Sequence, residues 1–491
     1  MATILGSSLA FIDGTVVNIA LPALQNNFQA TVVDVQWVVE SYGLFLAALI
    51  LVGGSLGDIF GRRLIFLLGV AIFALASAGC GVSSDIHQLV IARSIQGIGA
   101  ALLVPGSLAI ISASFDEKNR GQAIGTWSGF TALTTAIGPV LGGWLIEHAS
   151  WRWVFFINLP LAAAVIALSL RHVPESRSAG ASHVDWPGAT LVTLGLGGLV
   201  YGFIESASLG WNDPLVYGSL IVGAAGLIAF VFVEERATSP MVPLALFASR
   251  TFSGANLLTL FLYAAIGISF FLLPMNLIQV QGYSATAAGA ALLPMILLMF
   301  GLSRWSGGLV AHHGPELPLL VGPLVAALGF CLFAIPSIGV SYWTAFFPAV
   351  VVLGLGMAVT VAPLTTVVMN SVGPDRVGTA SGINNAVARV AGVLAIAILG
   401  ILMVQAFGHR LEKSLDRLDL DPAVRISIRA NLVKLGGLEV PASLDAGTAA
   451  TVQADIRQAF IFGFRLIMLA CSGLAMASAG VAWRSQRETR E

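Results

Sequence analysis

Long apolar runs recur along almost the whole of this 491-residue chain and leave it few ways to fold. Fourteen of them are long enough for a helix, which rises about 1.5 Å per residue, to cross a hydrocarbon core of about 30 Å. A helix satisfies its own backbone hydrogen bonds, as a segment surrounded by lipid must. The sequence therefore predicts an all-α polytopic membrane protein with spans at roughly 4–24, 36–57, 64–82, 88–112, 121–146, 153–170, 188–206, 214–233, 254–280, 286–311, 317–336, 342–369, 378–407 and 458–482.

The composition agrees with a surface that faces lipid. Hydrophobic residues make up 57% of the chain and charged residues only 10%, whereas a soluble protein has about 25% charged residues. The net charge of −1 argues against nucleic-acid binding. Cys80, Cys331 and Cys471 lie far apart in apolar runs, so we expect buried thiols and no metal or redox site.

The basic residues predict how the chain is oriented. With the N-terminus inside, twelve Lys and Arg fall in inside segments, and only Arg152 falls in a short outside loop. Both termini are therefore expected in the cytoplasm, with the protein in the cytoplasmic (inner) membrane. The polar segment 408–457 then lies outside. Its pattern of Leu411, Leu415 and Leu418 predicts an amphipathic helix, which favours a surface cap over a docking site for a periplasmic adaptor.

A short charged turn separates the second span from the third. Residues 54–63 read Gly-Ser-Leu-Gly-Asp-Ile-Phe-Gly-Arg-Arg. The glycines allow a tight turn, Asp58 is an anion at a helix end, and Arg62 and Arg63 suit a headgroup region. A connection of this kind is typical of a moving joint on the cytoplasmic side.

The turn after the tenth span repeats this spacing. Residues 307–314 keep the glycine–leucine–glycine pattern, with Ala311 in the place of Asp58. Spans one to six therefore look related to spans nine to fourteen, and both copies run in the same direction, as in two-halved transporters with a central site. We expect a six-helix half at 1–171, two inserted helices at 172–253 and a second six-helix half at 254–491.

These features resemble the fourteen-span drug:proton antiporter family of the major facilitator superfamily. Residues 54–63 resemble the loop signature of the superfamily, although Ile59 replaces the usual arginine, and residues 89–99 resemble its span-four motif. Residues 13–22 are similar to the span-one motif of the fourteen-span branch, and residues 151–160 to its span-six entry. The span-five antiporter signature is matched by Gly125, Gly138, Pro139, Gly142 and Gly143, with Thr134 where a glycine is common.

Embedded charges are the candidates for the transport site, because an ionised side chain near the bilayer centre costs about 2.5–3.5 kcal/mol on insertion scales. Asp13 lies near mid-depth, where burial favours the neutral carboxyl, so it could exchange a proton against a substrate or recognise a cation. The alternative is a carboxyl that only helps helices to pack.

Asp13 and the lack of a basic start also argue against a cleaved signal peptide. The chain begins almost inside its first span, which leaves open a longer natural N-terminus.

Glu40 and Arg93 enter their spans from the same side, at depths of about 6 and 8 Å. A carboxylate–arginine proton switch between them is geometrically possible, and the resemblance places the functional arginine of span four at Arg93. The alternative for Glu40 is a side chain that reaches the interface. Gln96, one turn after Arg93, could bind substrate or a neighbouring helix. Arg389 in span thirteen could line the central cavity or pair with another helix.

The remaining candidate residues are expected to act in the conformational change of the transporter. The resemblance implies a conformational latch at Gly54, Asp58, Gly61, Arg62 and Arg63, in which Asp58 accepts N–H bonds from the start of a neighbouring helix. The alternative is simple capping. Thr134, Gly138 and Gly142 form a small-residue stripe, and Pro139 bends the helix there, which suits close packing between the halves. A role in antiport for these residues and Gly125 rests on the resemblance.

The sequence as a whole predicts a secondary transporter and not an enzyme. The resemblance implies export of small amphipathic compounds by alternating access, driven by the proton gradient without any cofactor. No G-x-x-x-x-G-K-[ST] phosphate loop is present. An exporter of a dedicated metabolite, lipid or siderophore is the alternative. A membrane-embedded transferase is a remote one, because the acids are dispersed and do not cluster as they would around Mg²⁺.

Overall fold

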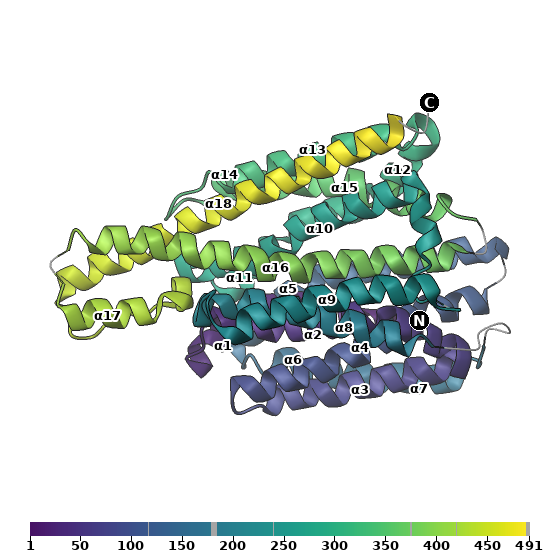
Figure 1. Cartoon of the computed structure of the whole chain (residues 1–491), viewed down its shortest axis with the longest axis horizontal. Coiled ribbons are helices and arrows are strands. Elements are labelled where there is room, and N and C mark those ends of the chain that lie inside the picture. Colours follow the sequence, from purple (N-terminus) through teal and green to yellow (C-terminus); the bar gives the residue numbers. More distant parts are fainter. Residues whose placement is uncertain (116, 178–183, 239, 374–375, 419, 488–491) are drawn as a thin grey trace.

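The computed structural model describes residues 1–115, 117–177, 184–238, 240–373, 376–418 and 420–487, and these residues form helices and connecting turns without a strand (Figure 1). In chain order the elements are α1 (Ala2–Phe28), α2 (Val32–Phe60), α3 (Arg62–Val82), α4 (Ile86–Ser114), α5 (Glu117–His148), α6 (Trp153–Phe156), α7 (Asn158–His172), α8 (Trp186–Leu209), α9 (Pro214–Arg236), η1 (Leu244–Ala248), α10 (Arg250–Met275), η2 (Asn276–Val280), α11 (Ala285–Ala290), α12 (Leu293–His313), α13 (Glu316–Phe333), α14 (Tyr342–Ala345), α15 (Phe347–Asn370), α16 (Val377–Leu415), α17 (Pro422–Ala430), η4 (Leu432–Gly437) and α18 (Ala446–Arg487).

The predicted all-α polytopic fold is confirmed. Thirteen helical segments of the described residues are long and apolar enough to cross a membrane. Three of these segments join a short element to a longer helix, namely α6 to α7, η2 to α10, and α11 to α12. The remaining predicted span is α5, a helix of 32 residues that packs along α1 and α11. Many side chains of α5 lie outside the described part of the chain.

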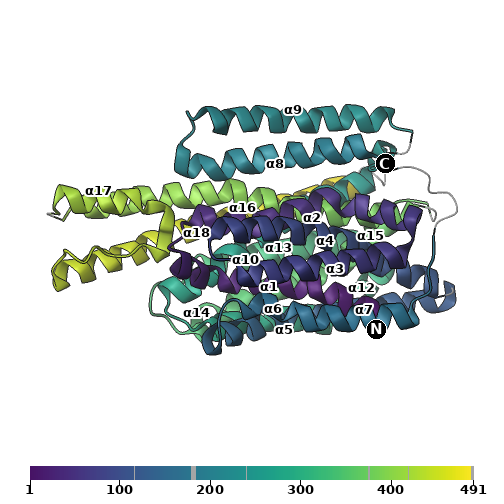
Figure 2. The ribbon, with the colours of Figure 1, turned by 90° about the horizontal axis from the view of Figure 1, so that it is seen from below.

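The long helices run side by side along one axis, and both chain termini lie at one end of the bundle (Figure 1). We call this the near end, and the opposite end, which carries α17, the far end. Within the first six spans, α4 packs along α2 and α3, and within the last six, α15 packs along α12 and α13 in the same way. The helices α8 and α9 pair with each other and form a separate layer on one side (Figure 2), where α8 contacts α2 and α16.

The two related turns of the sequence adopt related backbones. Gly61 separates α2 from α3 with a φ of 123°, and Gly314 ends α12 shortly before α13 with a φ of 72°. Both values lie in the region that glycine enters without the steric cost that a Cβ brings. The glycine spacing in the sequence therefore specifies where each helix can stop and the chain can reverse.

The segment 408–457 differs from the expected surface cap. The helix α16 continues to Leu415 and α18 begins at Ala446, so that the two helices and α17 project beyond the rest of the bundle (Figure 1). Leu411 and Leu415 are buried in one apolar cluster with residues of α17 and α18. The leucine pattern correctly indicated a helix, but its apolar face packs on neighbouring helices of the projection. The short helix η4 lies against the far end of the bundle, beside Gln25 and Gln279.

Close helix packing gives a testable contrast between two adjacent glycines of α2. A Cβ at Gly53 would collide with the backbone carbonyl of Ala101 on α4, whereas a Cβ at Gly54 would meet the Cβ of Pro105 at 3.8 Å, an ordinary contact. We expect Gly53→Ala to destabilise the protein by about 1–3 kcal/mol, as overpacking does, and Gly54→Ala to have little effect. Thermal unfolding of both variants in detergent measures this. Equal midpoints would show that α2 and α4 pack differently.

Candidate functional site

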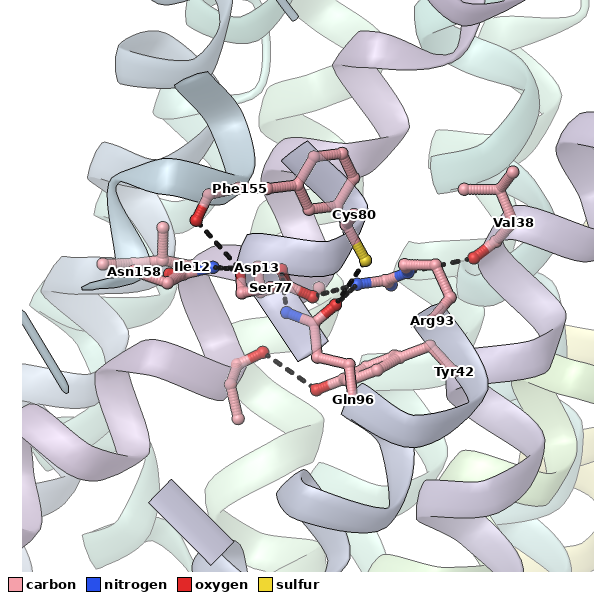
Figure 3. Close-up of polar contacts among 12 residues, drawn as sticks. Ile12, Asp13, Val38, Tyr42, Ser77, Cys80, Arg93, Gln96, Phe155 and Asn158 are labelled. Carbon is pink, nitrogen blue, oxygen red and sulfur yellow. Dashed lines mark hydrogen bonds and ion pairs between the residues drawn. The ribbon is translucent and has the colours of Figure 1, made fainter. Parts of the chain in front are cut away.

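A buried ion pair joins α1 to α4 (Figure 3). Arg93 Nη1 donates a hydrogen bond to Asp13 Oδ2 and a second one, of 2.7 Å, to Gln96 Oε1. Gln96 Nε2 and Asn158 Nδ2 donate to Asp13 Oδ1 at 2.9 and 3.2 Å. The side chain of Asp13 is 0% exposed and that of Arg93 is 1% exposed. Both carboxylate oxygens are therefore satisfied and shielded in this conformation.

The arginine is held from three further directions. Its Nε donates to the backbone carbonyl of Val38 at 3.1 Å, and its guanidinium lies 4.2 Å from the ring centroid of Tyr42 and 5.9 Å from that of Phe155. Tyr42 donates a hydrogen bond to the carbonyl of Ala10. A desolvated guanidinium over an aromatic face gains cation–π energy. The charge of Arg93 is thus balanced by Asp13 and further stabilised by cation–π contacts with rings from α2 and α6.

Residues that the sequence did not single out complete the cluster. Asn158, at the start of α7, also donates to Ser77 Oγ at 3.0 Å, and Ser77 donates to the carbonyl of Phe155 at 2.9 Å. The thiol of Cys80 lies 3.6 Å from Gln96 Oε1. An asparagine in an apolar span was the signal that could have predicted this site. With α6 and α7 counted as one span, five membrane-spanning segments therefore contribute to the cluster around Asp13.

Glu40 does not contact Arg93, so the expected Glu40–Arg93 pair is wrong for this structure. The reason is the helical phase of α2. Gln36 and Gly43, one turn to either side of Glu40, lie against Ile396 and Val393 of α16, whereas Val38 and Tyr42 face Arg93.

The carboxyl of Glu40 is also not at the interface with water. Its side chain is 0% exposed, and neither of its oxygens has a hydrogen-bond partner among the described residues. Burying a polar group without a hydrogen bond costs free energy. A proton on Glu40 would remove the larger cost of a buried charge.

Arg389 lies at the meeting point of four helices. It is half-buried on α16, which packs along α2 and α10, and its guanidinium is 5.7 Å from the ring centroid of Phe11 on α1. No carboxylate pairs with it within the described ranges. Asn384, five residues earlier on α16, donates to Thr259 Oγ1 of α10 at 2.7 Å.

The candidate latch at residues 54–63 makes contacts from both sides of the turn. Asp58, near the end of α2, accepts two hydrogen bonds from the side chain of Arg62, the first residue of α3, at 2.9 and 2.7 Å. The backbone N–H groups of Arg63 and Leu64 bond to Glu175 in the segment after α7, at 3.0 and 3.1 Å. Glu175 therefore caps the start of α3, a role that the sequence did not reveal.

The span-five residues pack in two directions. Cβ atoms built at Gly138 and Gly142 would meet Thr15 and Val16 of α1, within the first six spans. Gly138 and Gly142 therefore pack within the first six spans. On another side of α5, the backbone of Pro139 approaches Gly289, and a Cβ at Gly143 would meet the backbone of Ala285, so this helix also packs closely on α11 of the last six spans. Thr134 is half-buried. The surroundings of Gly125 lie outside the described residues.

Two hydrogen-bonded contacts join the first six spans to the last six at the far end. The N–H and the hydroxyl of Thr286, in the first turn of α11, donate to the two carboxylate oxygens of Glu147 on α5, both at 2.8 Å. Gln279 of η2 donates to Gln25 of α1 at 2.7 Å. We call these four residues the far-end gate. These hydrogen bonds, with Glu147 capping the start of α11, hold the two groups of helices together there.

Comparison with known proteins settles the family. Residues 3–396 match the family model described as Major Facilitator Superfamily. The chain belongs to the Major Facilitator Superfamily. A bacterial homologue of the human lysosomal transporter Spinster, in an inward-facing and unoccupied conformation, superposes with a TM-score of 0.67 at 17% identity, covering 99% of this chain and 97% of the other. This superfamily fold makes the chain a transporter.

Relatives within the superfamily are named for drug resistance. The multidrug resistance protein Stp of Mycobacterium tuberculosis is 35% identical over 431 residues, which cover 87% of this chain and 79% of Stp. The tetracenomycin C resistance and export protein of Streptomyces glaucescens is 33% identical over 494 residues, covering 98% and 90%. The resemblance drawn from the motifs is thereby confirmed.

The buried ion pair predicts a non-additive effect on stability. Arg93→Gln leaves the Asp13 carboxyl buried without its cation and should destabilise the protein by about 3–5 kcal/mol. Asp13→Asn combined with Arg93→Gln leaves two neutral amides, so the double variant should be more stable than Arg93→Gln alone. Thermal unfolding of the wild type, both single variants and the double variant measures this. A double variant as unstable as the sum of the singles would contradict the pairing.

Proposed function

We propose that the protein is a proton-coupled exporter of small amphipathic, drug-like compounds that works by alternating access. The observation that carries the proposal is a titratable carboxyl, Asp13, buried at mid-depth against Arg93 in a chain whose relatives are named as resistance and export proteins. The protein lies in the cytoplasmic membrane with the near end and both termini in the cytoplasm. The excess of basic residues in the short near-end segments supports this orientation.

The proton step is a change of partner at Asp13. In the ionised state the carboxylate binds Arg93, Gln96 and Asn158. A proton arriving from outside neutralises Asp13, weakens the ion pair and frees the guanidinium. Release of that proton to the cytoplasm restores the pair. Substrate is expelled to the outside in the same cycle, so that inward proton flow drives outward transport.

Glu40 is the second proton site of the proposal. It faces α16 across the contact between the first and the last six spans, and it has no hydrogen-bond partner within the described segments. A carboxyl in this position gains partners or water only when the helices move apart. Its protonation is therefore linked to the position of α2 relative to α16.

The far-end gate supports alternating access. With Glu147 bonded to Thr286 and Gln25 bonded to Gln279, this conformation is closed on the side that we assign to the exterior. Export requires these contacts to break once in each cycle. The gate is therefore a property of one state, and its release is part of the transport step.

Export of a dedicated metabolite, lipid or siderophore is the second candidate. It uses the same scaffold and the same carboxyls, and the substrate profile separates the two. The projection formed by α16, α17 and α18 would be the site for a periplasmic adaptor in either case.

Asp13→Asn should abolish proton exchange, because an amide cannot bind and release a proton at physiological pH. In inverted vesicles with an acidic interior, adding drug should collapse the pH gradient with the wild type and not with the variant. Asp445→Asn, at an exposed position of the far-end segment, is the matched control and should behave as the wild type. A collapse that persists in Asp13→Asn would move the proton site, and Glu40→Gln is then the variant to measure.

Cross-linking the gate should stop transport reversibly. In a background without the three native cysteines, Glu147→Cys with Thr286→Cys places two thiols across the contact of α5 and α11. Oxidation should stop export, and dithiothreitol should restore it, whereas each single variant should be insensitive to oxidant. Unchanged export by fully cross-linked protein would exclude opening at this contact.

A further inference from the structure

Arg389 holds a charge at the centre of the protein. It follows the start of α16 at Val377 by about three turns, which is roughly 18 Å into a core of about 30 Å. The side chain is half-buried, so it is accessible to another molecule. Its surroundings come from α1, α2 and α10, and therefore from both the first and the last six spans. A group bound there contacts both parts of a transporter that rocks around its centre.

The other embedded arginines whose side chains are described are already occupied. Arg93 is paired with Asp13. Arg465 of α18 donates to the backbone carbonyls of Ile335 and Pro336, both at 3.1 Å, near the far end. Glu40 lies on α2 between Gln36, which meets Ile396, and Gly43, which meets Val393, and both of these α16 residues come after Arg389. Neither carboxylate oxygen of Glu40 has a hydrogen-bond partner among the described residues, so Glu40 does not pair with Arg389. Arg389 alone combines mid-depth, partial exposure and an unbalanced positive charge among these three.

Such a charge is costly unless something balances it. Its contact with the Phe11 ring contributes about 0.5–2 kcal/mol, which does not offset removal of a guanidinium from water. The guanidinium presents a planar fork of N–H donors that matches a carboxylate or a sulfonate. The ring of Phe11 lies 5.7 Å from this fork, and an aromatic ring can pack on a flat apolar body.

We propose that Arg389 is the recognition point for an anionic group on an aromatic, amphipathic substrate. The inference rests on the proposed export function and names the substrate class of that function. A carboxylate or sulfonate bound to Arg389 balances the charge, while the aromatic body contacts the ring of Phe11. A purely cationic compound placed there would meet a like charge. The protein should therefore prefer acids to lipophilic cations of the same shape.

A matched pair of dyes tests this preference. A rhodamine ethyl ester is a cation, and the free acid of the same dye carries a carboxylate on the same ring system. Binding of each dye to the purified full chain in lipid nanodiscs is measured by fluorescence anisotropy. The wild type should bind the acid about tenfold or more tightly than the ester, as expected for a charge-assisted hydrogen bond. Arg389→Gln should lose this preference, and Arg389→Lys should keep part of it.

Arg465→Gln is the matched control, because it removes the same charge from an arginine that binds only backbone carbonyls at the far end. It should leave the preference for the acid unchanged. The proposal is overturned if the wild type binds the ester as tightly as the acid, if it binds neither dye, or if Arg389→Gln retains the preference.

Export is measured separately, so the two proposals can fail independently. An acid preference in binding without gradient-driven uptake in inverted vesicles would overturn proton-coupled export and leave the Arg389 site standing. Gradient-driven transport of the ester, with no preference for the acid in binding, would overturn the Arg389 site and leave proton-coupled export standing.

Discussion

The buried pair of Asp13 and Arg93 is the interaction on which the rest of the first six spans depends. A charge in a medium of low dielectric constant needs a partner within hydrogen-bonding distance, so α1 and α4 must keep one register. Gln96, Asn158 and the carbonyl of Val38 then bind the remaining donors and acceptors, and they bring α2 and α7 into the same arrangement. Protonation of Asp13 would remove the charge that holds this network together, and the proposed proton coupling depends on that step.

The features that the sequence predicted correctly are local ones. Apolar length alone specifies the spans, and an embedded charge such as Asp13 is visible as an interruption of an apolar run. The glycines at Gly61 and Gly314 mark turns because a positive φ is a property of one residue. Which side chains pair with each other is not a local feature. The depths of Glu40 and Arg93 in their spans are similar, but the rotation of α2 about its axis turns Glu40 towards α16. That rotation is determined by packing between helices, which the sequence of one span does not contain.

The same reasoning applies to carboxylates near helix ends. Asp58 was expected to accept N–H bonds from the start of a neighbouring helix, and the side chain of Arg62, the first residue of α3, supplies them. Glu175 and Glu147 follow spans in ordinary polar connections, and nothing in their neighbourhood distinguishes them in sequence. Each binds the N–H groups at the start of a helix that is distant in the chain. Such a contact depends on the tertiary arrangement of helices and is therefore not predictable from local pattern.

The positions of the charged groups also indicate how the proton site can sense the movement of the two groups of helices. Asp13, Arg93 and Gln96 all belong to the first six spans, so rocking as rigid bodies leaves their distances unchanged. The connection must pass through α2. Tyr42 lies against Arg93, while Glu40, two residues earlier, belongs to the face of α2 that meets α16. Because α2 moves with the first six spans, a shift against α16 leaves Tyr42 beside Arg93 and changes the surroundings of Glu40. Glu40 is therefore the carboxyl of the proposed transport cycle that senses the movement directly.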